Sequence, residues 1–359
     1  MLLDAVGKVL TADYCDASFR VQQLPRLLAQ FRPQALAATS RDAERAVVHA
    51  MLAQVPASHL ALYSKATSER LEAEIQGQPL PGLGCVLTCS DGRYFLDSVY
   101  DGGPAARAGL RRGDLVLAID GVEPASSKRL DWRSDDAALP DLPVHDLLAE
   151  LGERITLRIG GEGASREVEL QAEPVSGLAA TRAGTRIVGD GEVAALYLHL
   201  WFVYHGKAAR VLHDAMAAYP DTRALLLDLR GRGGSALECA PLLGELKAIR
   251  DRGVVIVALV DDRTRSAKEV VAYELRRHRL ATLVGQRTAG AMLPATLVPV
   301  GADSVLMYPA LRTGTYTRAI EGKGVAPHRE VADPFPGTPG KDPVLEAALA
   351  EVRAQIGPR

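Results

Sequence analysis

The sequence is poor in the features that mark disulfide-bonded, membrane-spanning or nucleic-acid-binding proteins. It has only four cysteines in 359 residues, too scattered for a disulfide framework and without a Cys-x-x-Cys pair that would indicate zinc. No apolar run is long enough to span a bilayer. The formal net charge of −2 gives no reason to expect nucleic acid or an anionic membrane surface as a partner. We therefore expect a globular chain with no metal site and no membrane span.

The first residues, MLLDAVGKVLTADYC, lack both the basic start and the long apolar core of a secretory signal. They predict a cytoplasmic protein by default, or a periplasmic one if a leader has been removed. A hydrophobic content of 47% over this length allows two or three domains. The pattern along the chain predicts an α+β multi-domain fold in three parts.

The first part, residues 1–82, is predicted to be helical. Apolar residues recur at helical spacing between Ala46 and Val55, and Ser40 lies where a helix N-cap would be. Directly behind this helix come Ser58 and His59. By themselves these two residues are equally well explained as a polar turn at the end of a helix.

The second part, residues 83–173, is predicted to be a compact β-rich module. Short alternating strands surround the turn SDGR, the short helix PAARAG and the strand LVLAIDG. VHDLLAELGE (144–153) is predicted as a helix beside the groove, and RITLRIGG and SREVELQA as closing strands. The intervening segment WRSDDAALPDLP (132–143) is predicted as an exposed polar loop.

The third part, residues 174–359, alternates strands and helices as a crossover-connected parallel sheet does. Apolar strands are predicted in EVAALYLHLW, RALLLDLR, VVIVALV and ATLVG. LPATLVPV, SVLMYPAL and TGTYTRAI are predicted as further strands, and DPVLEAALAEVRAQI as a closing helix. We expect this part to be an α/β crossover-sheet core.

Ser266 lies where the buried strand 254–260 turns into the helix that follows. In that position a serine hydroxyl lies at the carboxyl edge of the sheet, beside the positive end of the helix dipole, which suits a nucleophile. The alternative is that Ser266 serves only as an N-cap.

A glycine-rich turn in LLLDLRGRGGSA (225–236) also follows a strand, and it has two interpretations. Gly231, Gly233 and Ala236 fit a dinucleotide-binding G-x-G-x-x-A pattern, with Asp261 or Asp262 as the ribose-binding acid. Alternatively, the turn forms an oxyanion hole opposite the serine. In that case the backbone donors are those of Gly233, Gly234 and Ala267.

The order of these segments resembles a known family. GLGC and PAARAGLRRGDLVLAIDG resemble a PDZ domain, in which loop amides bind a peptide carboxylate and a strand edge pairs with the peptide. The resemblance implies peptide contacts from Leu83, Gly84, Cys85 and Val86. Together with DLRGRGGSALE, the strand and helix around Ser266, GKGVAPHREV and DPVLEAAL, the chain resembles the C-terminal processing (tail-specific) serine peptidases and their tricorn-core relatives from about residue 40 to 350.

The resemblance implies a catalytic core of the ClpP/crotonase-like kind. It also implies that Ser266 is the nucleophile and that Gly233 or Gly234 supplies oxyanion donors. One departure concerns the base, because Ser-Lys members of the family have a lysine where this chain has Ala291. Lys268 does not replace it, since two residues along a helix from the serine it points about 200° away. The tricorn branch instead implies Ser58, His59 and Glu321, in which the imidazole takes the proton and the carboxylate orients the imidazole.

These observations predict a serine endopeptidase that needs no cofactor and captures a polypeptide by its C-terminus. No nucleic-acid partner is expected, and a homo-oligomer is compatible with the sequence. Two alternatives remain: a catalytically inactive PDZ adaptor, which the missing lysine favours, and a nicotinamide-dependent oxidoreductase built on the glycine turn.

Overall fold

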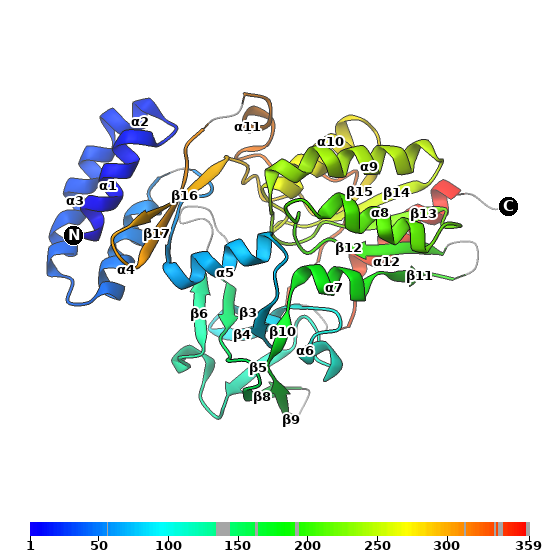
Figure 1. Ribbon diagram of the computed structural model, residues 1–359, viewed down its shortest axis with the longest axis horizontal. Helices are drawn as coiled ribbons and strands as arrows, with labels where there is room; N and C mark the ends of the chain where they lie inside the picture. Colours follow the sequence, from blue (N-terminus) through cyan, green and yellow to red (C-terminus); the bar gives the residue numbers. More distant parts are fainter. Residues whose placement is uncertain are drawn as a thin grey trace. The chain divides into compact units, whose positions relative to one another are not determined.

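The computed structural model describes residues 1–55, 57–133, 144–161, 164–190, 194–311, 314–333, 335–336 and 340–356 (Figure 1). The predicted loop at 132–143 therefore falls, apart from its first two residues, outside the described part of the chain. Backbone contacts group the chain into two compact units. The first contains Met1–Leu71 and Gly290–Lys323, with Arg133, and the second contains the remaining described residues.

The first unit is a helical bundle with a small sheet. Its helices are α1 (Leu2–Asp13), α2 (Ala17–Gln22), α3 (Leu24–Ala37), α4 (Arg41–Leu52) and the start of α5 (Lys65–Ile75). The predicted N-cap is confirmed, because the Ser40 side chain accepts a hydrogen bond from the Ala43 amide. The sheet has the order β1 (Ala61–Ser64), β17 (Ser304–Pro309), β16 (Ala295–Val300), with both pairs antiparallel.

Long-range pairing forms this sheet, since β1 comes from the helical front and β16 and β17 from the tail. Its apolar side chains join the helices in one buried cluster that includes Val48, Met51, Leu62, Leu306 and Tyr308. The cluster anchors the segment between α4 and β1, which carries Ser58 and His59.

The prediction of a strand in TGTYTRAI is wrong, because its described residues form helix α11 (Gly314–Ile320). Threonine and tyrosine favour strands only where a pleated neighbour is available, so tertiary context decides their conformation. Here Ile320 is fully buried, and the Glu321 amide donates to the Thr317 carbonyl to close the last turn. The helix therefore delivers Glu321 at its C-terminal end.

In the second unit, the β-rich module forms a seven-stranded sheet in the order β6-β7-β3-β4-β5-β8-β9. The strands are β3 (Cys85–Ser90), β4 (Arg93–Val99), β5 (Leu115–Ile119), β6 (Leu130–Arg133), β7 (Val144–Leu147), β8 (Arg154–Gly160) and β9 (Ser165–Gln171). The helix α6 (Pro104–Arg107) lies where PAARAG predicts it. A short pair of strands, β2 (Leu80–Gly82) and β10 (Glu173–Val175), flanks the module in sequence.

The helix predicted at 144–153 is also wrong. Residues 144–147 form β7, which pairs antiparallel with β3 and places Asp146 opposite Val86. The free edge of β3 offers backbone hydrogen bonds, and strand pairing there buries Val144 and Leu147, so a short segment with weak helical signals becomes a strand. As a result β3 has a partner strand on each side.

The α/β part of the second unit is a six-stranded sheet in the order β11-β12-β13-β14-β15-β18. Its strands are β11 (Arg186–Val188), β12 (Ala195–His199), β13 (Ala224–Asp228), β14 (Val255–Val260), β15 (Thr282–Gly285) and β18 (Arg329–Glu330). β11 is antiparallel to β12, and the other pairs are parallel. The four apolar strands predicted for the core are therefore confirmed.

The connections of this sheet are α8 (Ala208–Ala218), α9 (Cys239–Asp251) and α10 (Ala267–Arg277), which lie side by side in Figure 1. The predicted closing helix is α12 (Pro343–Ile356), and it contributes Val344, Ala348 and Val352 to a cluster with Leu226 and Val257 of the sheet. Since these strands are parallel and adjacent, the carboxyl ends of β12, β13 and β14 lie along one sheet edge. Among the described helices, none combines the length and apolar composition needed to cross a membrane.

Candidate active site

Ser266 stands at the junction of β14 and α10, in a backbone conformation that few residues adopt. Its φ is 55° and its ψ is −125°, and its side chain makes no capping hydrogen bond to the helix. Ser266 thus occupies the N-cap position of α10 without the side-chain hydrogen bond by which an N-cap serine stabilises a helix. A non-glycine residue held in this region costs about 1–3 kcal/mol, and such strain clusters at functional sites.

The turn before Ser266 is held by the buried carboxylate of Asp261. Its Oδ1 accepts hydrogen bonds from the Thr264 hydroxyl at 2.8 Å, the Arg263 amide at 3.2 Å and the Gly231 amide at 3.0 Å. One carboxylate thus ties the serine turn to the glycine turn on the neighbouring strand. Because it is used in this way, the structure does not support Asp261 as a ribose-binding acid.

Gly233 lies against the serine side chain. A Cβ atom on Gly233 would lie 2.7 Å from the Ser266 Cβ and 3.4 Å from its Oγ, so no other residue fits without displacing the hydroxyl. Gly234 has a φ of 137°, and a Cβ there would lie 2.5 Å from the backbone N and O of Val203. Both glycines are therefore required by close backbone approach.

Backbone amides of the same turn and of the helix start have no acceptor among the described residues. Val203 donates its amide to the Gly233 carbonyl at 3.0 Å and accepts from the Ser235 amide at 2.8 Å. Within the described chain, the amides of Gly233, Gly234 and Ala267 donate to no acceptor. Ala267 is the first residue of α10, whose early amides have no partner in the helix. These are the groups that can stabilise a developing oxyanion.

Beneath the glycine turn lies a buried ionic network. The Arg230 guanidinium contacts both carboxylate oxygens of Asp228 and both of Asp342, and the Tyr197 hydroxyl donates to Asp228 Oδ2 at 2.7 Å. Burial is the largest single effect and raises the pKa of Asp228, but the Arg230 charge and hydrogen bonds, together with smaller contributions from His199 and Tyr197, outweigh it and hold the pKa of that carboxyl well below its usual range. The network anchors the start of the turn to the sheet.

His199 ends strand β12 next to this network. Burial lowers its pKa to about 4, and the charges of Lys268 and Arg230 act in the same direction, so its imidazole is neutral at physiological pH. Its Nε2 lies 3.4 Å from the Arg230 carbonyl oxygen, and its ring stacks on Trp201 with centroids 3.9 Å apart. His199 therefore packs against the turn. Among the described residues, no three His, Cys, Asp or Glu side chains group as metal ligands.

In the first unit, Ser58, His59 and Glu321 meet although 263 residues separate the serine from the carboxylate. The Ser58 Oγ lies 3.0 Å from His59 Nδ1 and 3.0 Å from Glu321 Oε2. The amides of Ser58, Met292 and Leu293 also donate to the carboxylate, at 3.1, 2.7 and 3.1 Å. Ser58 is fully buried, and His59 is 8% exposed.

This arrangement decides which imidazole nitrogen carries the proton. A carboxylate accepts only, so the Ser58 hydroxyl must donate its hydrogen to Glu321. The Ser58 oxygen then accepts from the His59 Nδ1–H, as it does from the Leu293 amide at 3.2 Å. The neutral ring therefore has its lone pair on Nε2, the form that a general base needs. His59 also has a φ of 56°, a second strained non-glycine residue.

Ala291, at the position of the family lysine, belongs to the same unit and is fully buried. The Lys268 Nζ donates to the Arg230 carbonyl at 2.8 Å, so this side chain is hydrogen-bonded to the start of the glycine turn.

In the PDZ-like module, the loop Leu83–Gly84 has its carbonyl groups turned inward. The Leu83 carbonyl accepts from the Ala105 amide at 2.9 Å, and the Gly84 carbonyl accepts from the Tyr100 amide at 2.8 Å. Because a trans peptide places N–H and C=O on opposite sides, the Gly84 and Cys85 amides point the other way. Past this loop, the edge of β3 from Val86 onward is paired with β7.

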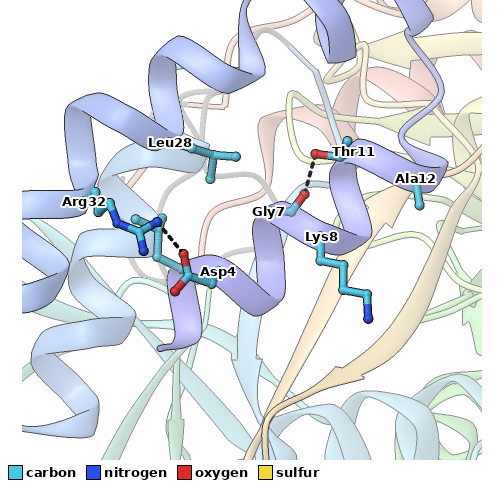
Figure 2. Close-up of a pocket in the computed structure, with 8 residues that line it drawn as sticks. Asp4, Gly7, Lys8, Thr11, Ala12, Leu28 and Arg32 are labelled. Carbon is cyan, nitrogen blue, oxygen red and sulfur yellow. Dashed lines mark hydrogen bonds and ion pairs between the residues drawn. The ribbon is translucent and has the colours of Figure 1, made fainter.

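A separate groove of about 380 Å³ lies between α1 and α3 (Figure 2). Arg32 donates to Asp4 across it at 2.8 Å, and Lys8 lines the same groove. None of the predicted site residues lines this groove.

Two family models match separate segments of the chain. The model of peptidase family S41 matches residues 245–331, which include Ser266 and Glu321, and a PDZ domain model matches residues 95–131. A carboxy-terminal-processing protease of Bartonella bacilliformis is 25% identical over 289 residues, covering 71% of this chain and 62% of the relative. A tricorn protease homolog of Streptomyces coelicolor is 25% identical over 396 residues, covering 96% of this chain and 31% of the relative. The chain thus spans less than two thirds of the length of these relatives.

Two solved structures share the fold. The photosystem II D1 C-terminal processing protease superposes with a TM-score of 0.55 at 18% identity, over 97% of this chain and 96% of that one. The tricorn protease superposes with a TM-score of 0.55 at 15% identity, over 99% of this chain and 36% of that one. The chain therefore shares the fold of these proteases, and its residues 245–331 are similar to peptidase family S41 and its residues 95–131 to PDZ domains.

Proposed function

We propose that this protein is a serine endopeptidase in which Ser266 attacks the peptide carbonyl. The observation that carries the proposal is the strained serine, uncapped and pressed against Gly233, with unpaired amides of the glycine turn and helix start beside it. This is the constellation that acyl transfer needs, a nucleophile with preorganised donors for the oxyanion.

The proposed base is His59. Its Nε2 takes the proton from the Ser266 hydroxyl and returns it to the leaving amine, while Glu321 acts through Ser58 to hold the imidazole in that tautomer and stabilise its charged form. The proposal requires that the His59 ring reach the serine in the working enzyme. Support comes from the contacts among Ser58, His59 and Glu321, the three residues that the resemblance to the tricorn branch implies. It also comes from Ala291, which stands where the Ser-Lys peptidases have their lysine.

The proposed substrate is a polypeptide captured by its free C-terminus. The outward amides of Gly84 and Cys85 form the carboxylate site, and Leu83 and Val86 flank it. Pairing of a peptide along β3 beyond Val86 would require β7 to leave that edge. The loop at Leu83–Gly84, here called the carboxylate loop, is therefore the part of the module that would recognise a C-terminus.

A fluorophosphonate probe tests the nucleophile, because it reacts covalently only with an activated serine. Labelling is expected in the wild type and lost in Ser266→Ala and His59→Ala. Ser176→Ala is the matched control, since Ser176 is a helix-entry serine that caps α7 (Gly177–Gly184) by accepting from the Ala179 amide. Labelling that persists in folded Ser266→Ala would refute the assignment.

The alternative is a catalytically inactive member that only binds peptides, and the alanine at position 291 favours it. A wild-type protein that binds a peptide with a free C-terminus but reacts neither with the probe nor with peptide substrates would establish this alternative. Weaker binding of the same peptide with an amidated C-terminus would assign the binding to the carboxylate loop in either case.

A further inference from the structure

Lys268 is a buried cation in an unfavourable position. It is the second residue of α10, it is fully buried, and within the described chain no carboxylate lies within ion-pair distance of it. A positive charge at a helix N-terminus opposes the helix dipole, and burial of an unpaired charge adds a large desolvation penalty. A lysine kept under both penalties is a candidate for a functional role.

The Lys268 side chain ends at a single backbone group. Its Nζ donates to the Arg230 carbonyl oxygen at 2.8 Å, and the next amide, that of Gly231, donates to Asp261 Oδ1 at 3.0 Å. The Arg230–Gly231 peptide plane is therefore fixed at both ends. This plane begins the turn that places Gly233 against Ser266.

We propose that Lys268 is a positioning residue for the oxyanion hole. It holds the Arg230–Gly231 peptide so that the Gly233 and Gly234 amides face the tetrahedral intermediate, and its charge adds to the positive field there. This inference rests on the proposed function of Ser266. Lys268 thus contributes to the reaction from beneath the turn, without contact to the substrate.

Several titratable groups surround the ammonium group. Asp228 ends β13, Asp261 follows β14, Arg230 opens the glycine turn, and the neutral His199 ends β12. Burial lowers the pKa of Lys268 to about 7, Arg230 acts in the same direction, and the two carboxylates oppose it. The fraction of charged Lys268 therefore changes near neutral pH.

The test is the rate at which Ser266 is acylated by the fluorophosphonate probe, measured from pH 6 to 9 in the full chain. Lys268→Met, nearly isosteric and apolar, is expected to react about 10- to 100-fold more slowly, somewhat less than the loss from removing an oxyanion donor itself. With a peptide substrate the loss should appear in kcat, with KM unchanged. Lys207→Met is the matched control, because Lys207 Nζ also donates to a backbone carbonyl, that of Gln76 at 2.6 Å.

Thermal unfolding separates positioning from a structural role. Removal of a buried cation is expected to leave the Tm of Lys268→Met at pH 6 equal to or above that of the wild type while acylation slows. Lys268→Gln, which keeps a polar donor and loses the charge, is the second variant and should recover part of the rate that Lys268→Met loses. Wild-type rates in both variants, or losses of rate and Tm in parallel, would overturn the inference. A wild type that is not labelled at Ser266 would overturn the proposed function as well.

Discussion

Substitution of Glu321 by glutamine tests the proposed proton-transfer route through a change of few atoms. The carboxylate accepts four hydrogen bonds, three at Oε2 from the Ser58 hydroxyl and the Met292 and Leu293 amides, and one at Oε1 from the Ser58 amide. If the glutamine oxygen takes the Oε2 position, its NH₂ group faces the Ser58 N–H. Two donors then oppose each other, and His59 loses the negative charge that stabilises its protonated form.

The size of the effect follows from these contacts. One unsatisfied buried donor costs about 1–3 kcal/mol, and the remaining bonds weaken because they are no longer charge-assisted. If this free-energy cost raises the activation barrier, kcat/KM for a fluorogenic peptide should fall about 10- to 100-fold in Glu321→Gln. His59→Ala removes the base itself and is expected to lose about 10⁴-fold or more.

Glu69→Gln is the matched control, since Glu69 lies on α5 with its side chain 66% exposed, 3.9 Å from Lys65. It should leave kcat/KM unchanged. The reasoning is refuted if folded Glu321→Gln keeps wild-type activity, because the imidazole would then need no carboxylate. An effect as large as that of His59→Ala would assign Glu321 a larger part than orientation.

Three further predictions concern the second unit. Gly233→Ala places a Cβ 2.7 Å from that of the serine and should slow acylation about 10²-fold, whereas Gly244→Ala, with no neighbour within 4 Å, should have no effect on the same rate. Asp228→Asn breaks the buried pair with Arg230 and should lower the free energy of unfolding in urea by about 3–5 kcal/mol; an unchanged midpoint would contradict the pairing. Burial lowers the pKa of Lys268 in the folded protein to about 7, so the unfolded chain holds more protons than the folded one between about pH 7 and 10.5. The free energy of unfolding of the wild type should therefore rise with pH through this window. Thermal unfolding scans of Lys268→Met should lack this rise.

The sequence predicted the parallel core and the position of Ser266 because both depend on local pattern. An apolar strand followed at once by a helix needs no long-range information, and β14 and α10 lie where that pattern places them. The meeting of Ser58 with Glu321, 263 residues apart, has no local signal, and it was expected only through family resemblance.

Tertiary context, strand pairing in one case and burial in the other, explains the two errors in secondary structure. β7 forms because β3 has an edge to be paired, and α11 forms because Ile320 is buried in its own unit. Neither circumstance can be read from the residues of the segment itself. The helical angle that points Lys268 away from Ser266 places its side chain at the start of the glycine turn, where its Nζ donates to the Arg230 carbonyl.

Backbone strain supports the site independently of family resemblance. Among the described residues, five other than glycine have a positive φ. Asp91 and Asp120 each precede a glycine in a two-residue hairpin turn, and Arg279 follows the end of α10, so ordinary turn and cap chemistry explains these three. His59 and Ser266 have no such explanation, and they are the two residues to which the proposal assigns proton transfer and attack.

This contrast leads to a prediction about stability. If Ser266 is held in a strained conformation for chemistry, Ser266→Gly should relieve that strain, whereas Ser266→Ala removes the hydroxyl and keeps the strain. Both variants should be inactive toward the probe, but the glycine variant should be more stable by about 1 kcal/mol or more in urea unfolding, even though glycine has the more flexible unfolded chain. A glycine variant less stable than the alanine variant would mean that the serine turn is relaxed, and the argument from strain would fail.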